Sequence, residues 1–170
     1  MSAILKTVGT IVMSASAEKL VAKTKFGRGE VKARPNCPRK NFNIWFFAGD
    51  GKVEEPQDEQ TLCYHELCQP CCNSSIIDEL GGEAKAETTL TVMSSLMKMQ
   101  ENRERGVLLT NAMANIFYVR DVAGTLRTVY VSWIDGSWRI GAMTTHSSFK
   151  WSHRGFGNCR VFSRQVHSKA

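Results

Sequence analysis

Asp135 and Gly136 lie between two runs of alternating apolar residues, and they give the strongest local indication of how this chain folds. An Asp-Gly pair is typical of a two-residue hairpin turn, because these residue types accept the positive φ that the turn requires. The turn fixes the register of the strands on either side of it. The expected cross-strand pairs are Trp133–Trp138, Val131–Ile140 and Val129–Ala142. All six side chains fall on one face, so the sequence predicts a half-buried hairpin.

Further strands are predicted on both sides of this hairpin. Residues 121–124 are expected to form a four-residue loop, which sets Ile116 opposite Val129 on the apolar face. A two-residue loop would instead place Arg120 opposite Arg127, and this like-charge pair disfavours it. A last strand is expected over Asn158 to Gln165. The C-terminal third is therefore predicted to be an antiparallel β-meander.

Helical periodicity is clearest over residues 83–105, which lie between Gly82 and Gly106. The stripe Ala86, Leu90, Met93, Leu96 and Met97 is expected to face the core, because Met usually fills irregular gaps there. Residues 3–25 are predicted to form an amphipathic helix, residues 26–41 an extended basic arm, and residues 43–48 a short strand.

These elements predict an α+β fold in which the C-terminal meander packs on one long helix. A chain of 170 residues accommodates one domain and an arm. We expect residues 1–41 to form an N-terminal helix with its arm, and residues 42–170 to form a single α+β domain. The first 17 residues resemble a signal peptide only faintly, and no apolar run is long enough to span a bilayer. The expectation is an intracellular protein, in the cytoplasm or within a particle, with no membrane contact.

Four of the six cysteines and one histidine lie within residues 63–72. Thiolate and imidazole are the ligands that structural zinc prefers, and disulfides are rare inside cells. The candidate ligands are Cys37, Cys63, His65, Cys68, Cys71 and Cys72. Cys63, Cys68 and Cys71 form the preferred set, with one of the other three as the fourth ligand. The sequence therefore predicts a zinc-clipped loop, with free thiols or disulfides as the alternatives.

The chain carries a net charge of +6, and its charges are unevenly distributed. Residues 19–40 contain eight basic residues and only one acidic residue, whereas residues 50–66 contain six acidic residues and one lysine. Residues 149–160 alternate aromatic with basic side chains, a pattern suited to stacking on unpaired bases while neutralising phosphates. The same alternation also fits a strand with one buried face. The candidate nucleic-acid contacts are Lys25, Arg28, Lys32, Arg34, Arg39, Lys40, Lys150, Trp151, Arg154, Phe156 and Arg160.

Three functions are compatible with these patterns. The first is a small non-catalytic, zinc-stabilised protein that binds RNA or another single strand within a ribonucleoprotein or a viral particle. The second is a structural assembly subunit whose N-terminal arm contacts protein partners. The third is a cysteine-dependent hydrolase, with Cys63 or Cys72 as the nucleophile and His146 or His153 as the base. The sequence has no nucleophile elbow and no phosphate-binding loop, so we favour binding over catalysis.

Overall fold

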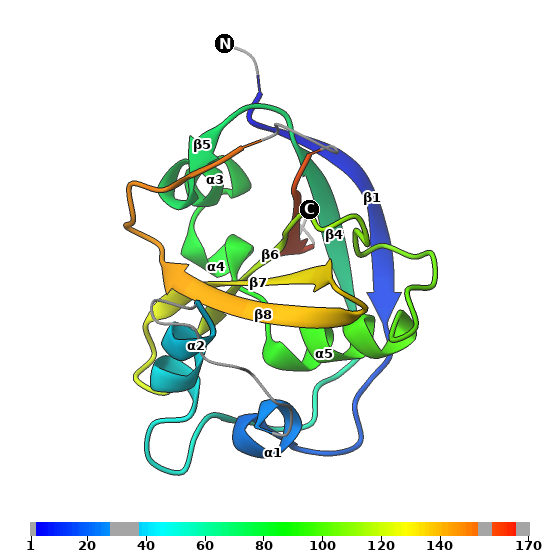
Figure 1. Ribbon diagram of the computed structural model, residues 1–170, viewed down its shortest axis with the longest axis vertical. Coiled ribbons are helices and arrows are strands. Elements are labelled where there is room, and N and C mark those ends of the chain that lie inside the picture. Colours follow the sequence, from blue (N-terminus) through cyan, green and yellow to red (C-terminus); the bar gives the residue numbers. More distant parts are fainter. Residues whose placement is uncertain (1–2, 28–37, 153–157, 166–170) are drawn as a thin grey trace, which may run out of the picture.

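A six-stranded sheet forms the centre of the computed structural model, which describes residues 3–27, 38–152 and 158–165. In spatial order the strands are β1 (Leu5–Met13), β4 (Gln60–Leu67), β10 (Arg160–Arg164), β6 (Asn115–Arg120), β7 (Leu126–Ile134) and β8 (Ser137–Thr144). β10 runs parallel to β6, and the other neighbouring strands are antiparallel. The predicted mixed α+β class is therefore confirmed (Figure 1).

Short helices and two-residue strands complete the fold. The helices are α1 (Ala22–Phe26), α2 (Pro38–Phe46), α3 (Asn73–Leu80), α4 (Glu83–Ala86) and α5 (Leu90–Met99). The short strands pair as β2 (Leu20–Val21) with β3 (Val53–Glu54), and as β5 (Cys71–Cys72) with β9 (Lys150–Trp151). Within the described residues, no helix is long and apolar enough to cross a membrane.

Each face of the sheet has its own apolar core. On one face, side chains of α1, α2 and α5 pack against sheet residues such as Phe117 and Phe162. On the other face, α3, α4, β5 and β9 cover residues that include Ile116 and Val161. The sheet is thus the middle layer of three, because alternate residues of its strands point into opposite cores.

The hairpin predicted around Asp135 and Gly136 is confirmed in its register. Trp133 pairs with Trp138, and their rings meet edge to face with centroids 5.3 Å apart. Both turn residues have positive φ, 51° at Asp135 and 81° at Gly136. The pairs Val131–Ile140 and Val129–Ala142 follow, and all four of these side chains lie in the core that α2 and α5 cover.

The predicted register between β6 and β7 is wrong by one position. Val129 pairs with Phe117, whereas Ile116 points into the opposite core. The connection consists of residues 121–125, one residue longer than predicted. Asp121 explains the extra residue, because its side chain accepts hydrogen bonds from the backbone of Ala123 and of Thr125 at 2.9 and 3.0 Å. An Asp that bonds the following backbone stabilises such a turn.

The predicted N-terminal helix is wrong, because residues 5–13 form β1 and pair with β4. β-branched Val8, Ile11 and Val12 favour a strand, and a register shift between Thr7 and Gly9 interrupts the alternation that would have revealed it. Within the predicted helix over residues 3–25, only residues 22–25 are helical, and they belong to α1. Met13 and Phe26 are buried in the same core as residues of α5 and β7.

Three other predicted elements are also corrected. Residues 38–41 of the predicted extended arm and residues 43–46 of the predicted strand both belong to α2. This helix buries Phe42 and Phe46 on one side, so helical spacing prevails over the strand preference of the aromatic residues. The single helix over residues 83–105 is divided into α4 and α5. Thr89 caps α5 by accepting a hydrogen bond from the Val92 backbone at 3.3 Å. Met93 is nevertheless fully buried, as the predicted core stripe requires.

We expect Gly136→Val to destabilise the protein by about 1–2 kcal/mol, because a β-branched residue strains a backbone held at positive φ. Ala123→Val is the matched control, since Ala123 is exposed in the other hairpin connection and is not among the residues with positive φ. Urea unfolding monitored by tryptophan fluorescence measures both. Equal effects of the two substitutions would contradict the turn assignment.

Candidate functional site

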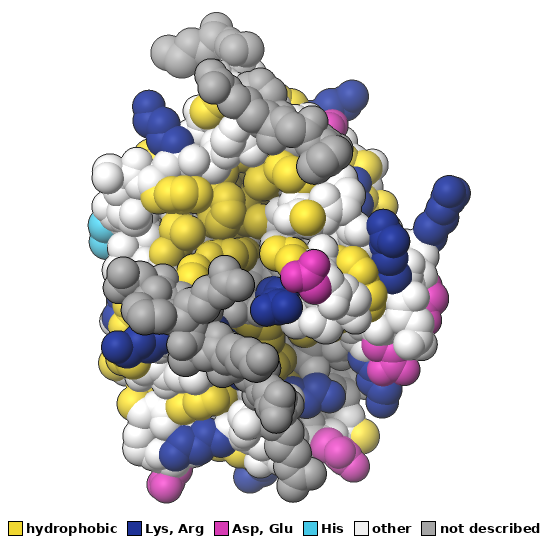
Figure 2. Space-filling view, viewed as in Figure 1, with side chains coloured by type: hydrophobic (Ala, Val, Ile, Leu, Met, Phe, Trp, Pro, Cys, Tyr) yellow, Lys and Arg dark blue, Asp and Glu magenta, His cyan; other side chains and the backbone are white. Residues whose placement is uncertain are grey.

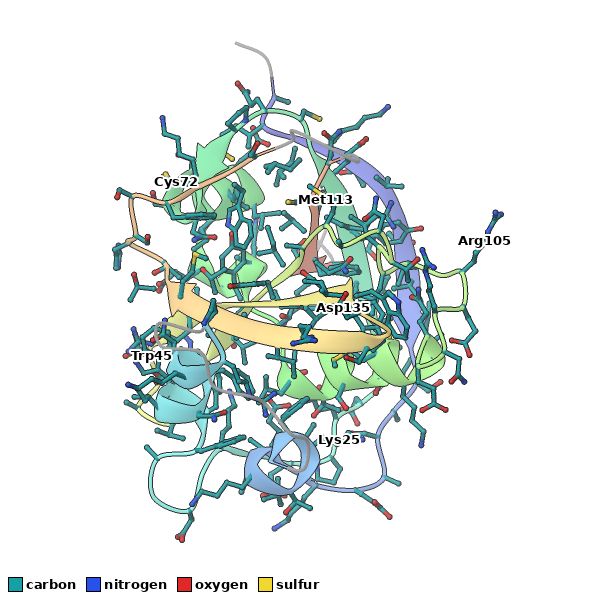
Figure 3. The ribbon with its side chains drawn as sticks, viewed as in Figure 1. Lys25, Trp45, Cys72, Arg105, Met113 and Asp135 are labelled. Atoms are coloured by element: carbon teal, nitrogen blue, oxygen red, sulfur yellow. The ribbon has the colours of Figure 1, made fainter. Side chains whose placement is uncertain are left out.

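Cys72 is the thiol of the cysteine cluster that is best prepared for chemistry. It occupies the N-cap position of α3, and its sulfur lies 3.1 Å from the Ser74 hydroxyl and 3.3 Å from the Ser75 hydroxyl (Figure 3). Hydrogen bonds from Ser74, from Ser75 and from the Ser75 backbone lower the pKa of Cys72 to about 7. A partly exposed thiol with such a pKa is substantially thiolate at neutral pH, and the thiolate is the nucleophilic form.

Cys71 has the opposite environment, although it is the adjacent residue. Successive strand residues point to opposite sides, so Cys71 is buried in the core beneath α3. Burial raises the pKa of Cys71 to about 11, and the nearby charges of Cys72, Glu79 and Cys159 act in the same direction. Cys159 is buried in the same core, although it was outside the predicted ligand set. The fold therefore places two protonated thiols below a reactive one.

Asn73 anchors this region from within. Its side chain is fully buried, and its carbonyl oxygen accepts hydrogen bonds from the Tyr118 hydroxyl at 3.0 Å and from the Trp151 indole at 2.8 Å. Its amide nitrogen lies 3.3 Å from the sulfur of Met143. Because a buried polar group is costly when it lacks a partner, these contacts fix the start of α3 relative to β6, β8 and β9.

The remaining cluster residues lie on or just after β4. His65 is held at both ring nitrogens, with Nδ1 3.1 Å from the Thr7 hydroxyl and Nε2 3.0 Å from the Ser163 hydroxyl. Burial lowers the pKa of His65, which favours neutral imidazole at pH 7. Cys63 is half-buried on the same strand, and burial raises the pKa of its thiol. Cys68 is exposed beyond the end of the strand.

The predicted zinc ligands are divided between β4, which carries Cys63 and His65, and β5, which consists of Cys71 and Cys72. Within the described ranges, no three His, Cys, Asp or Glu side chains form a group that could hold a metal ion. His65 is engaged by two hydroxyl groups, and Cys71 is enclosed by apolar neighbours. Cys37 lies outside the described residues. The zinc site accordingly stays a prediction.

An open cleft of about 670 Å³ lies beside the acidic connection that precedes β4. Its lining residues are Pro56, Gln57, Asp58, Glu59, Gln60, Thr61, Thr89, Arg164 and Gln165. These groups can form hydrogen bonds and ion pairs, but they include neither a thiol nor an imidazole. The cleft therefore adds no support to thiol catalysis.

The predicted nucleic-acid contacts fall into three groups. Arg28, Lys32, Arg34, Arg154 and Phe156 lie outside the described residues. Three others have partners inside the fold. Trp151 is only 6% exposed. Arg39 donates to the carbonyl of Phe26, and Arg160 donates to the carbonyl of Val107 at 2.6 Å. Lys25, Lys40 and Lys150 form the exposed group.

The exposed lysines do not form one surface. Lys25 lies at the end of the molecule opposite Cys72 in Figure 3, and Lys150 pairs with Cys72 across the β5–β9 ladder. On the face that Figure 2 shows, Lys and Arg side chains are scattered among acidic and uncharged ones. Stacking by Trp151 would also require the ring to leave its buried position. The described residues thus offer limited support for an extended nucleic-acid surface.

No family model, curated protein or solved structure matches this chain.

We predict that Cys72 reacts with iodoacetamide in its thiolate form, with a midpoint near pH 7. Ser74→Ala and Ser75→Ala should each move this midpoint to higher pH, because each removes a hydrogen bond that favours the thiolate. Ser95→Ala, on the exposed side of α5, is the matched control. Peptide mass spectrometry across a pH series measures each cysteine separately, and an unchanged midpoint in both serine variants would contradict the assigned cause.

Proposed function

We propose that this chain is a non-catalytic subunit of a larger assembly, and that it joins its partners through protein–protein contacts at the β1 edge of the sheet. The observation that carries the proposal is the exposure of this terminal strand. β1 pairs with β4 on one side and ends the sheet on the other. Its Val8 and Val12 side chains are 47% and 59% exposed. An exposed terminal strand offers backbone hydrogen-bonding groups to an incoming strand.

The contrast between the two sheet edges supports this assignment. At the other edge, α2 lies against β8, and Asn41 donates a hydrogen bond to the carbonyl of Ala142 at 3.1 Å. In Figure 1, β1 runs along the outer margin of the sheet beyond β4. Folded proteins commonly cover or interrupt edge strands to prevent unwanted pairing. A strand of nine residues that remains largely exposed is therefore a candidate interface.

Photo-cross-linking tests this function. We expect p-benzoylphenylalanine at Val12 to form protein adducts in extract of the source cells, since its exposed side chain would face the partner. The same group at Val122 is the control, because Val122 is exposed in the connection between β6 and β7. Adducts at both positions alike, or at neither, would contradict an interface at β1.

Nucleic-acid binding is the second candidate, and the contact between α1 and α2 favours it. Arg39 joins α2 to the Phe26 carbonyl at the end of α1, and exposed Lys25 and Lys40 are the neighbours of these two residues. This contact holds the two lysines on adjoining elements, as a phosphate-binding surface requires.

For this second candidate, the double variant Lys25→Ala/Lys40→Ala should flatten the salt dependence of binding to single-stranded RNA. The expected change is about 1.4 units in the logarithmic slope if both side chains contact phosphates. Lys98→Ala on α5 is the control. Filter binding across a salt series measures the slope, and an unchanged slope removes this surface from consideration.

A further inference from the structure

The register shift in β1 divides the strand into two unlike parts. Val8 is the extra residue, because Thr7 pairs with His65 whereas Gly9 pairs with Tyr64. Lys6, the only charged residue of β1, precedes this irregularity. Residues 9–13 follow it with uninterrupted pairing to β4 and without a charge. Charges and bulges protect an edge from pairing, so the unprotected part of β1 is confined to residues 9–13.

We propose that residues 9–13 pair antiparallel with the same residues of a second copy, about a two-fold axis at Ile11. This inference rests on the proposed assembly function and names the partner. The symmetry sets Thr10 of each copy opposite Val12 of the other, and Gly9 opposite Met13. Thr10 and Val12 are both exposed, and β-branched pairs directly across a ladder stabilise it. The two six-stranded sheets would then become one continuous sheet.

Charge complementarity favours this second copy and its direction. In the antiparallel arrangement, the Lys6 end of one strand runs towards the residues that follow Met13 in the partner. That segment is bonded to the acidic connection of its own copy, with the Ser16 backbone donating to the Gln57 carbonyl at 2.8 Å. Exposed Asp58 and Glu59 follow Gln57 in the chain, whereas Glu55 forms an ion pair with Lys19 of its own copy at 3.4 Å. A parallel arrangement would instead bring the two Lys6 side chains together.

The size of the paired segment indicates a weak dimer. Stable protein interfaces bury roughly 1,200–2,000 Å² in total and involve about 20–30 residues a side, far more than five paired residues per copy. The dimer should consequently form in a concentration-dependent manner, and a second contact within a larger assembly would strengthen it.

Light scattering of the purified chain over a concentration series tests the dimer. We expect the mass to rise from monomer to dimer, and Val12→Lys to weaken association by about tenfold, because two exposed β-branched pairs are lost. Val122→Lys is the matched control and should leave association unchanged. Val12 is exposed, so Val12→Lys should keep its melting temperature. A chain that is monomeric at every concentration, or a Val12→Lys variant that associates normally, overturns the inference.

A mixture of two cysteine variants tests the register. Under oxidised glutathione, chains carrying Thr10→Cys should form a disulfide with chains carrying Val12→Cys, because these positions face each other. Both chains also carry Cys63→Ser, because Cys63 pairs directly with residue 10 across the β1–β4 ladder. Either double variant alone should then form no interchain disulfide at the new cysteine, and the Cys63→Ser chain controls for the other native thiols. Peptide mass spectrometry identifies the bond. A disulfide between two Thr10→Cys chains, or between two Val12→Cys chains, overturns the register about Ile11.

The two proposals fail in different ways. If the chain is always monomeric while a benzophenone at Val12 still labels another protein, the second copy is excluded as the partner and the assembly function stands. If the chain is monomeric and Val12 labels no protein, both proposals are overturned.

Discussion

The parallel pairing of β10 with β6 is the contact on which the whole sheet depends. It joins β1, β4 and β10 to the meander of β6, β7 and β8 through only two residue pairs, Arg160–Asn115 and Val161–Ile116. Stacking of Phe117 on Phe162, with centroids 4.6 Å apart, reinforces it from one core. The functional features lie on either side of this join. The β1 edge belongs to the half of the sheet that contains β4 and β10. The other half ends with β8, and β9, which pairs with Cys72, comes next in the chain.

The parts of the fold that the sequence predicted well are those determined by neighbouring residues. The hairpin around Asp135 and Gly136 needs only a local turn and alternating side chains. The helix predicted over residues 3–25 follows from apolar residues at helical spacing. The extra residue at Val8 breaks the alternation typical of a strand, and it is visible only once β4 is paired beside β1. The strand predicted over residues 43–48 fails for a related reason, since burial of Phe42 and Phe46 against distant residues decides the conformation of α2.

The region around Cys71 and Cys72 was likewise predictable only where neighbouring residues determine the structure. Adjacent Cys71 and Cys72 point to opposite sides of their strand, and alternation along an extended chain is enough to predict this. The roles of Asn73 and Cys159 could not be inferred in this way. Asn73 acts through Trp151, which is 78 residues away, and Cys159 comes near Cys71 only through the folded core. The aromatic and basic pattern around Trp151 was ambiguous, since a buried strand produces it as readily as a stacking surface.

The central position of β10 affects how the protein is made. β4 needs β10 beside it, yet His65 and its partner Ser163 are 98 residues apart in the chain. A ribosome adds about 5–20 residues per second, so β4 leaves it several seconds before its neighbour exists. During that interval the edge that β10 will later fill is open to other chains. Synthesis rate and chaperone supply should therefore influence the yield of this protein.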